Sequence, residues 1–374
     1  MLYETKTTLT VERQTESTNI FAMGTTITTP NLIHKPHVHI HDIIPAPPIS
    51  NGYNDLLIQT AQACPKNYEV FFIPKASGGL REITAPNEEL KKQQTDLLHW
   101  LSALLTPPHP AVHSYLPEHS ALTEMQAHQN NNSRWFLKCD IKDFFPSISP
   151  ELIKNQLMKQ YSFATNAKAA DFLTLLDILA YYAGGLPQGA PTSPFLSNFA
   201  LYEFDHKLTT ALEEIDNQFC YTRYADDLLI SHPADFSRNH KNSILQYINV
   251  LLAEINMQIK DSKTRYGSSA GRNWNLGLMY NKDQNITIGH ARKKKIKHRL
   301  YQFLCQYQAW KQNTEENEGH ADERAQITLH NELQELNGEL SYLQHIEPNY
   351  YQYLLTKYET KFNISFRQIR KELL

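Results

Sequence analysis

Residues 221–231 read YTRYADDLLIS, and Asp226 and Asp227 lie at the centre of this run between two apolar, β-prone segments. Side chains alternate between the two faces of a strand, so the two carboxylates cannot both point to solvent on one face. If the segments form a hairpin, the pair lies at or beside its tip, where carboxylates repel each other unless a cation lies between them. Hard cations such as Mg²⁺ prefer carboxylate oxygens. The run therefore predicts a metal-binding hairpin, with a solvated acidic turn as the alternative.

A second acidic position follows the apolar segment 135–137. Asp140 ends this predicted strand, where a buried charge is costly unless it is paired or binds a metal. Asp143 is predicted to be the acid at the start of the following turn, a structural role. One carboxylate at a strand end and a pair at a hairpin tip, about 85 residues apart, can meet on neighbouring strands. Three such acids can hold two Mg²⁺ ions and align an in-line displacement at phosphorus.

Composition sets the broad class. The chain has 374 residues, of which 41% are hydrophobic and 20% charged, and its net charge is −3. This balance gives no global signal for nucleic acid, so such a signal must be local. The four cysteines lie far apart without a CxxC pair, which predicts neither a zinc site nor a disulfide framework. No signal peptide opens the chain and no apolar run approaches membrane-spanning length. These features predict a soluble cytoplasmic protein without a membrane partner.

Residues 1–50 differ from the rest, because they are rich in Thr and Pro and end in a Pro-rich stretch. They are expected to form an N-terminal extension of unknown role. His37, His39 and His41 alternate as on one face of a strand, with His34 nearby. A metal site is the functional interpretation, and a polar strand face is the more common one.

Periodicity predicts alternating strands and helices followed by an all-helical tail, which is an α+β or α/β core. A loop rich in Gly and Pro, 184–194, is expected to open a further helix. The other expected elements are strands at 68–73, 80–84 and 135–141, a second hairpin at 274–290, and helices at 88–105, 150–161, 168–183, 240–256 and beyond 291, with a hydrophilic loop at 312–323.

Four motifs, in order, resemble those of the reverse transcriptases, particularly the bacterial enzymes of retrons, group II introns and phage defence. They are FIPKASGGLREI at 72–83, DIKDFFPSI at 140–148, GLPQGAPTSP at 185–194 and YADD at 224–227. The resemblance covers about residues 68–360. It implies an α+β right-hand polymerase fold with an antiparallel sheet in the palm. The implied domains are fingers at 51–135, a palm at 136–290 with a fingers insertion at about 150–185, and a helical thumb at 291–374.

The resemblance also implies a catalytic centre. Asp140 and Asp226 would bind two Mg²⁺ ions, for which Mn²⁺ is a candidate substitute. Asp227 would lie close behind these ligands or bind a metal ion only occasionally. Ile141 is included in this metal site as well. Lys263 resembles the lysine that would protonate the departing pyrophosphate.

A nucleotide site is implied by the same motifs. Lys75 and Arg81 flank a Gly-rich turn and suit a triphosphate, with a solvated basic hairpin as the alternative. Gln188, expected to begin a helix, would place an amide against the incoming nucleotide. Phe145 would lie under the sugar and exclude a 2′-OH, thereby selecting deoxynucleotides. Phe144 is the alternative, because strand alternation lets only one ring face the site, and core packing is expected for the other.

A basic run opens the presumed thumb. Six cations fall within eight residues of a predicted helix: Arg292, Lys293, Lys294, Lys295, Lys297 and Arg299. Such a run is usually a solvated face. Because it follows a strand pair that resembles the primer grip, phosphates of a template–primer duplex are the favoured partner.

The function that the resemblance implies is RNA-directed DNA synthesis from dNTPs, on a dedicated non-coding RNA, in bacterial antiphage defence. Retron enzymes usually show Asn-Ala-x-x-His before the first catalytic Asp and Val-Thr-Gly after YADD. The nearest stretches, 125–128 and 275–277, depart from both. This favours a stand-alone defence enzyme over a retron enzyme that makes branched, RNA-linked DNA.

The other expected partners are the RNA template, the DNA product, and a protein effector or a second reverse transcriptase. An alternative of another class is a non-catalytic RNA-binding scaffold. The intact acids argue against it, since a scaffold has no use for clustered unpaired carboxylates. RNA-templated RNA synthesis is disfavoured by the aromatic residues at 144–145.

Overall fold

The computed structural model describes residues 67–75, 78–160, 167–270, 275–316 and 323–373. The N-terminal extension, the histidines at 34–41 and Cys64 lie outside the described residues. The described cysteines, Cys139, Cys220 and Cys305, are free thiols. Within the described ranges, no helix has the length and apolar character needed to cross a membrane.

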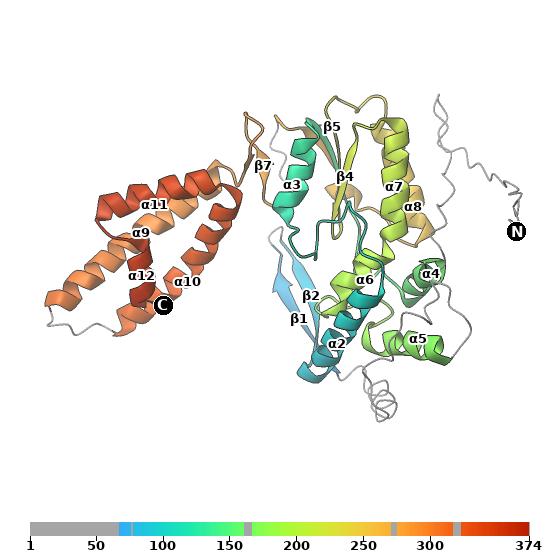
Figure 1. Ribbon diagram of the computed structural model, residues 1–374, viewed down its shortest axis with the longest axis horizontal. Helices are drawn as coiled ribbons and strands as arrows, with labels where there is room; N and C mark the ends of the chain where they lie inside the picture. Colours follow the sequence, from blue (N-terminus) through green and yellow to red (C-terminus); the bar gives the residue numbers. More distant parts are fainter. Residues whose placement is uncertain (1–66, 76–77, 161–166, 271–274, 317–322, 374) are drawn as a thin grey trace, which may run out of the picture. The chain divides into compact units, whose positions relative to one another are not determined.

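The fold is α+β, as predicted, and divides into two compact units. One unit contains the described residues up to Ala111, with Ile141–Phe219 and Ser237–Ile259. Its elements, labelled in Figure 1, are β1 (Tyr68–Pro74), β2 (Leu80–Pro86), α2 (Glu88–Leu104), α4 (Pro150–Gln160), α5 (Ala167–Leu179), α6 (Thr192–Ala200), α7 (Tyr202–Ile215) and α8 (Lys241–Glu254).

Helix α2 organises this first unit. It begins after Asn87, whose side chain accepts a hydrogen bond from the Leu90 amide and caps the helix. The buried Gln94 donates hydrogen bonds to the Tyr68 hydroxyl at 2.9 Å and to the Leu179 carbonyl at 2.7 Å. One polar side chain therefore fixes α2 to the start of β1 and to the end of α5.

The second unit contains Val112–Asp140, Cys220–Phe236 and the described residues from Lys260 onward. Its elements are α3 (Ala121–Asn130), β3 (Trp135–Asp140), β4 (Cys220–Tyr224), β5 (Asp227–His232), the short 3₁₀ helix η3 (Asp261–Lys263), β6 (Arg265–Ser268), β7 (Met279–Tyr280), β8 (Ile286–Thr287), α9 (His290–Glu316), α10 (Glu323–Ile346), α11 (Pro348–Phe362) and α12 (Phe366–Leu373).

An antiparallel sheet with strand order β4–β5–β3–β6 forms the centre of this unit. Strand β5 is buried from Leu228 to Ile230, as expected for a central strand with both faces covered. Helix α3 packs against β4. The sheet is therefore a rigid base for any side chain at its strand ends.

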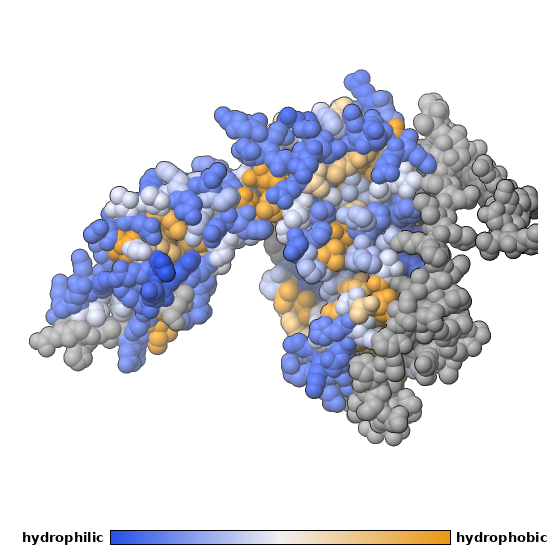
Figure 2. All heavy atoms as spheres, in the orientation of Figure 1, coloured by the Kyte–Doolittle hydropathy of each residue, from blue (hydrophilic) through white to orange (hydrophobic). Residues whose placement is uncertain are grey.

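The C-terminal helices share a buried leucine-rich core, to which Leu333, Leu336, Leu340 and Leu343 of α10 contribute at helical spacing. The side of α9–α12 that Figure 2 shows is mainly hydrophilic. This pattern is that of an amphipathic helical bundle with a solvated outer surface. The predicted fingers, palm and thumb boundaries stay a prediction.

Predicted and observed elements agree in order and differ in detail. The helix expected at 168–183 ends at Leu179, before Ala183 and Gly184, which both have positive φ angles. Helix α9 continues to Glu316, so the first part of the loop expected at 312–323 is helical. Helices α3 and α7 were not predicted.

Candidate active site

The YADD run forms the tip of the β4–β5 hairpin. Tyr224 pairs with Asp227, and Ala225 and Asp226 are the turn residues between them. Ala225 has a φ of 55°, a left-handed conformation that costs a residue with a Cβ roughly 1–2 kcal/mol. Its amide donates a 2.8 Å hydrogen bond to the buried Ser114 hydroxyl, and Arg223 donates to its carbonyl. These bonds hold the tight turn that places Asp226 just beyond the strand.

Asp140 and Asp227 are register partners at the end of β3 and the start of β5. Directly opposed residues of an antiparallel pair project from the same face, so the two carboxylates are neighbours. Asp226 adjoins them in the turn. The structure therefore brings the three predicted acids together on neighbouring strands, as their positions in the sequence suggested.

Two lysines accompany these acids. Lys263, which ends η3, forms an ion pair with Asp140. The Nζ atom of Lys138 lies 3.2 Å from an Asp227 carboxylate oxygen. Neither pair includes Asp226. Burial alone would lower the pKa of Lys263, but its hydrogen bond to Asp140 and the charges of the three acids raise it overall.

Asp226 has the most perturbed carboxylate of the cluster. Burial, together with the charges of Asp227 and Asp140, raises its pKa from 3.8 to about 6. Burial also raises the pKa of Asp227, against the opposing effect of Lys138. The two lysines therefore leave surplus negative charge at the hairpin tip.

This donor set fits a hard divalent cation. Carboxylate oxygens are the ligands that Mg²⁺ and Mn²⁺ take, and a cation would relieve the repulsion that raises the pKa of Asp226. Among the described residues, no three His, Cys, Asp or Glu side chains stand grouped as they would around a metal ion. In this arrangement Lys263 pairs with one carboxylate oxygen of Asp140 and Lys138 with one of Asp227, so the second oxygen of each carboxylate is the candidate metal ligand.

The predicted nucleotide-binding residues lie in the first unit. Lys75 and Arg81 are exposed beside the turn of the β1–β2 hairpin, where Arg81 pairs with Ile73. Apolar side chains on this hairpin are exposed as well, and Phe72 keeps 57% of its surface accessible. The hairpin thus presents cations and aromatic surface together.

Gln188 lies in a turn and does not begin a helix, since α6 starts at Thr192. This corrects the predicted helix start. The Gln188 carbonyl accepts a 2.9 Å hydrogen bond from the Thr84 amide of β2. Gly189 has a φ of 141°, and a Cβ there would lie 2.9 Å from the Thr84 carbonyl oxygen, so glycine is required. The Pro-Gln-Gly loop is therefore fixed against β2.

Phe144 and Phe145 lie in a series of turns at 142–147, so strand alternation does not separate them, contrary to the prediction. Burial separates them instead. Phe144 is a core residue with 6% exposure, whereas Phe145 is half-buried. The Phe145 carbonyl accepts a 3.1 Å hydrogen bond from the Leu186 amide, two residues before Gln188. The turn at Phe145, the Pro-Gln-Gly loop and β2 are thus connected by backbone hydrogen bonds within one unit.

The basic run on α9 divides into engaged and solvated cations. Lys293 forms an ion pair with Glu347, Arg299 pairs with Glu335 and Glu339, and Arg292 stacks over the Tyr342 ring at 4.4 Å. The remaining three, Lys294, Lys295 and Lys297, are exposed. The structure thus narrows the candidate phosphate contacts to these three lysines.

Replacing Lys294, Lys295 and Lys297 together by Gln should weaken binding to a template–primer duplex. The slope of log K against log salt should flatten by up to about 3, because each lost phosphate contact accounts for about 0.9. Fluorescence anisotropy at several salt concentrations measures this. Arg299→Gln is the contrast, since its guanidinium already pairs with two glutamates, and it should change the slope less. If the two variants changed the salt slope equally, the division of these cations into paired and solvent-exposed groups would be contradicted.

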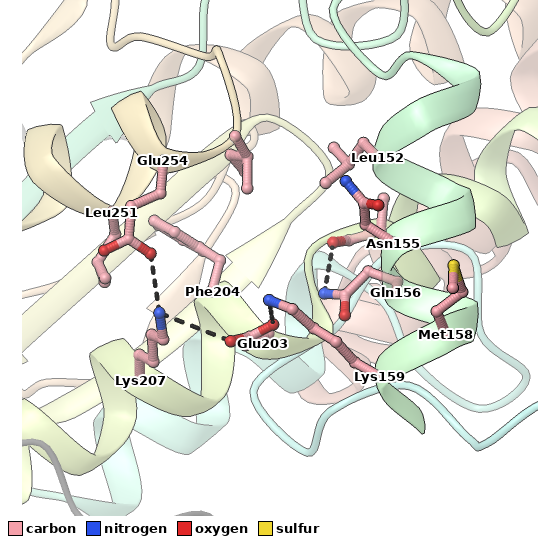
Figure 3. A pocket seen from close by; sticks show the side chains of 12 residues that line it. Leu152, Asn155, Gln156, Met158, Lys159, Glu203, Phe204, Lys207, Leu251 and Glu254 are labelled. Carbon is pink, nitrogen blue, oxygen red and sulfur yellow. Dashed lines mark hydrogen bonds and ion pairs between the residues drawn. The ribbon is translucent and has the colours of Figure 1, made fainter. Parts of the chain in front are cut away.

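A pocket of about 400 Å³ lies in the first unit between α4, α7 and α8 (Figure 3). Its charged side chains are already paired: Glu203 with Lys159 and Lys207, and Lys207 with Glu254. None of the residues predicted for the catalytic or nucleotide site lines it. It is therefore not part of the candidate active site.

Three polar residues near the acids were not predicted: Lys138, Glu124 and Asn275. Lys138 could have been found, because it precedes Asp140 by two residues on a strand and so shares its face. Glu124 and Asn275 hydrogen-bond to each other at 2.7 Å across 151 residues of sequence. Glu124 adjoins one stretch that departs from the retron pattern, and Asn275 begins the other. The two departures therefore meet in space.

Comparisons with known proteins show the family of this chain. A family model described as reverse transcriptase (RNA-dependent DNA polymerase) matches residues 73–313. The retron Ec73 reverse transcriptase of Escherichia coli is 29% identical over 79% of this chain and 87% of its own length. The retron Mx65 reverse transcriptase of Myxococcus xanthus is 31% identical over 69% of this chain and 60% of its own.

A solved telomerase from Candida albicans, in complex with a fragment of telomeric RNA, matches 84% of this chain and 66% of its own, with 11% identity and a TM-score of 0.42. Of the two bacterial groups considered from the sequence, the curated relatives above support the retron alternative over the favoured stand-alone group. The chain belongs to the reverse transcriptase family and, within it, is related to the retron reverse transcriptases of bacteria.

Proposed function

We propose that this reverse transcriptase makes DNA from dNTPs by phosphoryl transfer at Asp140, Asp226 and Asp227, with two Mg²⁺ ions as cofactors and Mn²⁺ as a substitute. The observation that carries the proposal is the pairing of Asp140 with Asp227 across β3 and β5, with Asp226 in the adjoining turn. Reverse transcriptases generally use divalent metal ions. When bound, such ions stabilise the charge that develops on the transferring phosphate and activate the attacking hydroxyl.

The chain's own residues supply the other requirements of the reaction. The three aspartates would hold the ions, with the adjoining Ile141 as part of that site. Lys263 would donate a proton to the departing pyrophosphate. Its ion pair with Asp140 supports this role, because it holds the ammonium beside the proposed metal site.

Nucleotide binding is assigned to the connected segments of the first unit. Lys75 and Arg81 would contact the triphosphate, where the Arg guanidinium can bind two phosphate oxygens at once. Gln188, in a turn fixed to β2, would contact the incoming nucleotide. Phe145, half-buried in its turn, would exclude a 2′-OH, while Phe144 serves the core.

The template is proposed to be a cognate non-coding RNA, and the product a DNA linked to RNA as in retrons, in the cytoplasm of a bacterium. The relatedness to retron enzymes supports this choice. Antiphage defence is the proposed biological role, with a protein effector or a second reverse transcriptase as a further partner.

Primer extension with the purified full chain tests the proposal. With Mg²⁺ and an RNA template, the protein should incorporate dNTPs, and EDTA should stop the reaction. NTPs should be used about 10²-fold more slowly, the discrimination expected for a hydroxyl against an apolar wall. Equal rates with NTPs and dNTPs would contradict the proposal that Phe145 excludes the 2′-OH. Folded, RNA-bound protein that extends nothing would instead favour the scaffold.

Sequencing the nucleic acid that copurifies with the protein identifies the template. RNA and DNA joined covalently in one molecule support the retron assignment. DNA copied from an RNA to which it is not joined would support the stand-alone group.

A further inference from the structure

A continuous chain of polar contacts leads from Asp227 into the interior of the second unit. The Lys138 ammonium lies 3.2 Å from Asp227 and donates a 2.9 Å hydrogen bond to the side-chain carbonyl of Asn275. The Asn275 amide donates in turn to a Glu124 carboxylate oxygen at 2.7 Å. Helix α3, strand β3 and the segment before β7 thus meet behind the hairpin tip.

The second carboxylate oxygen of Glu124 reaches the hairpin itself. It accepts a 3.1 Å hydrogen bond from the Thr222 hydroxyl on β4, which lies 2.8 Å from Nε2 of His128. Glu124 therefore connects the strand that leads into YADD with the residue that holds Lys138. One end of this chain of contacts is at Asp227 in the acidic cluster, and the other is at Thr222 and His128 in the interior.

Donor and acceptor chemistry fixes the direction of these bonds. A lysine ammonium has only donors, so the Asn275 oxygen must face Lys138 and its NH₂ group must face Glu124. Each member then has the partner that its chemistry requires. Glu124 and Asn275 are 0% and 4% exposed, so solvent cannot replace a lost partner.

We propose that Glu124 and Asn275 are positioning residues, which hold the Lys138 ammonium against Asp227 and thereby fix the orientation of that carboxylate for catalysis. This inference rests on the proposed role of Asp227 in phosphoryl transfer. A buried network of this kind fixes side-chain geometry when every member is satisfied and loses that effect when one is removed. Asn275 acts through Lys138, and Glu124 acts through Asn275.

The test is a double-mutant cycle on the full chain, read by steady-state dNTP incorporation with Mg²⁺. Asn275→Leu keeps the branching of the side chain and removes both hydrogen bonds. It should lower kcat about tenfold and leave the KM for dNTP within about twofold, because one buried hydrogen-bond partner is lost. In a Lys138→Met background the same substitution should have no further effect on kcat, since Lys138 is the residue through which Asn275 acts.

Glu124 provides the conservative variant. In Glu124→Gln the new amide can accept from Asn275 and donate to Thr222, so kcat should stay within about threefold of the wild type. Glu124→Met has no such groups and should match Asn275→Leu. Ser120→Ala is the control, because it removes the N-cap of the same helix and touches neither Lys138 nor Asn275. It should lower the thermal midpoint and leave kcat unchanged.

Several results would overturn the proposal. Additive losses in the Asn275→Leu, Lys138→Met double variant would show that Asn275 does not act through Lys138. A folded Asn275→Leu protein with wild-type kcat would show that Asn275 has no positioning role. If Asn275→Leu does not fold, Asn275→Ala takes its place in the cycle with the same expectations. A wild-type protein that incorporates no dNTP refutes the proposed function itself, a result distinct from an active wild type with insensitive variants.

Discussion

Replacing Asp226 by Asn should abolish DNA synthesis and, at the same time, stabilise the folded chain. Activity should fall at least about 10³-fold, because a metal-ligating carboxylate stabilises charge that develops in the transition state. Stability should rise because Asn removes a partly buried negative charge that Asp140 and Asp227 repel. Primer extension measures the first effect, and thermal or urea unfolding without divalent ions measures the second.

The sign of the stability effect follows from the direction of the pKa shift. The folded state raises the pKa of Asp226 from 3.8 to about 6, so the folded state binds its proton more tightly than the unfolded state does. Ionisation of Asp226 therefore costs stability as pH rises from about 4 to 6, and the loss is complete above that range. The shift corresponds to roughly 3 kcal/mol at most. Solvent screening of a partly exposed group reduces this to roughly 1–2 kcal/mol.

The free energy of unfolding of Asp226→Asn should thus exceed that of the wild type at pH 7 and approach it at pH 4. Asp143→Asn is the matched control, since Asp143 is an exposed acid three residues after Asp140. That variant should keep both wild-type activity and wild-type stability. An Asp226→Asn protein that retains more than about 1% of activity would remove Asp226 from the metal site. An Asp226→Asn protein that is less stable than the wild type at pH 7 would contradict the inferred repulsion of Asp226 by Asp140 and Asp227.

The acidic cluster could be predicted because its elements are local. A hairpin with Asp226 in the turn follows from two β-prone segments around one short break, and Asp140 follows from one apolar strand. Their meeting requires only that β3 and β5 be neighbours, which they are. What local patterns cannot contain is the set of contacts between distant segments. Glu124 and Asn275 are ordinary polar residues in the sequence and become buried partners only when α3 packs against the sheet.

The basic run on α9 shows the same limit. Six cations in eight residues indicate a basic helix, but the glutamates that engage two of them, Lys293 and Arg299, lie on α10 and at the start of α11. A sequence window cannot separate paired from solvated charges when the partners are 36 or more residues away. Gln188 is a similar case, because its turn is set by a hydrogen bond from Thr84 of β2 and not by its own neighbours.

Phe145→Ala should relax the choice between deoxynucleotides and ribonucleotides while leaving the fold intact. The Phe145 ring is half-buried in a turn whose backbone is bonded to Leu186, and its removal opens space without disturbing that bond. The ratio of kcat/KM for dTTP to that for UTP should fall about 10²-fold, the size of a discrimination based on one hydroxyl. The change should come mainly from faster use of UTP, since loss of a steric clash improves the excluded substrate.

Phe144→Ala is the matched control, which shows whether exclusion of the 2′-OH depends on one ring alone. Phe144 packs against Phe145 with ring centroids 5.2 Å apart and is itself buried. Its truncation should therefore destabilise the chain by about 3–5 kcal/mol, as loss of a core phenylalanine does, and leave sugar selection largely unchanged. If Phe144→Ala relaxes selection and Phe145→Ala does not, the two rings exchange roles. If neither does, selection rests on another group, because a steric gate has to respond when the ring that forms it is removed.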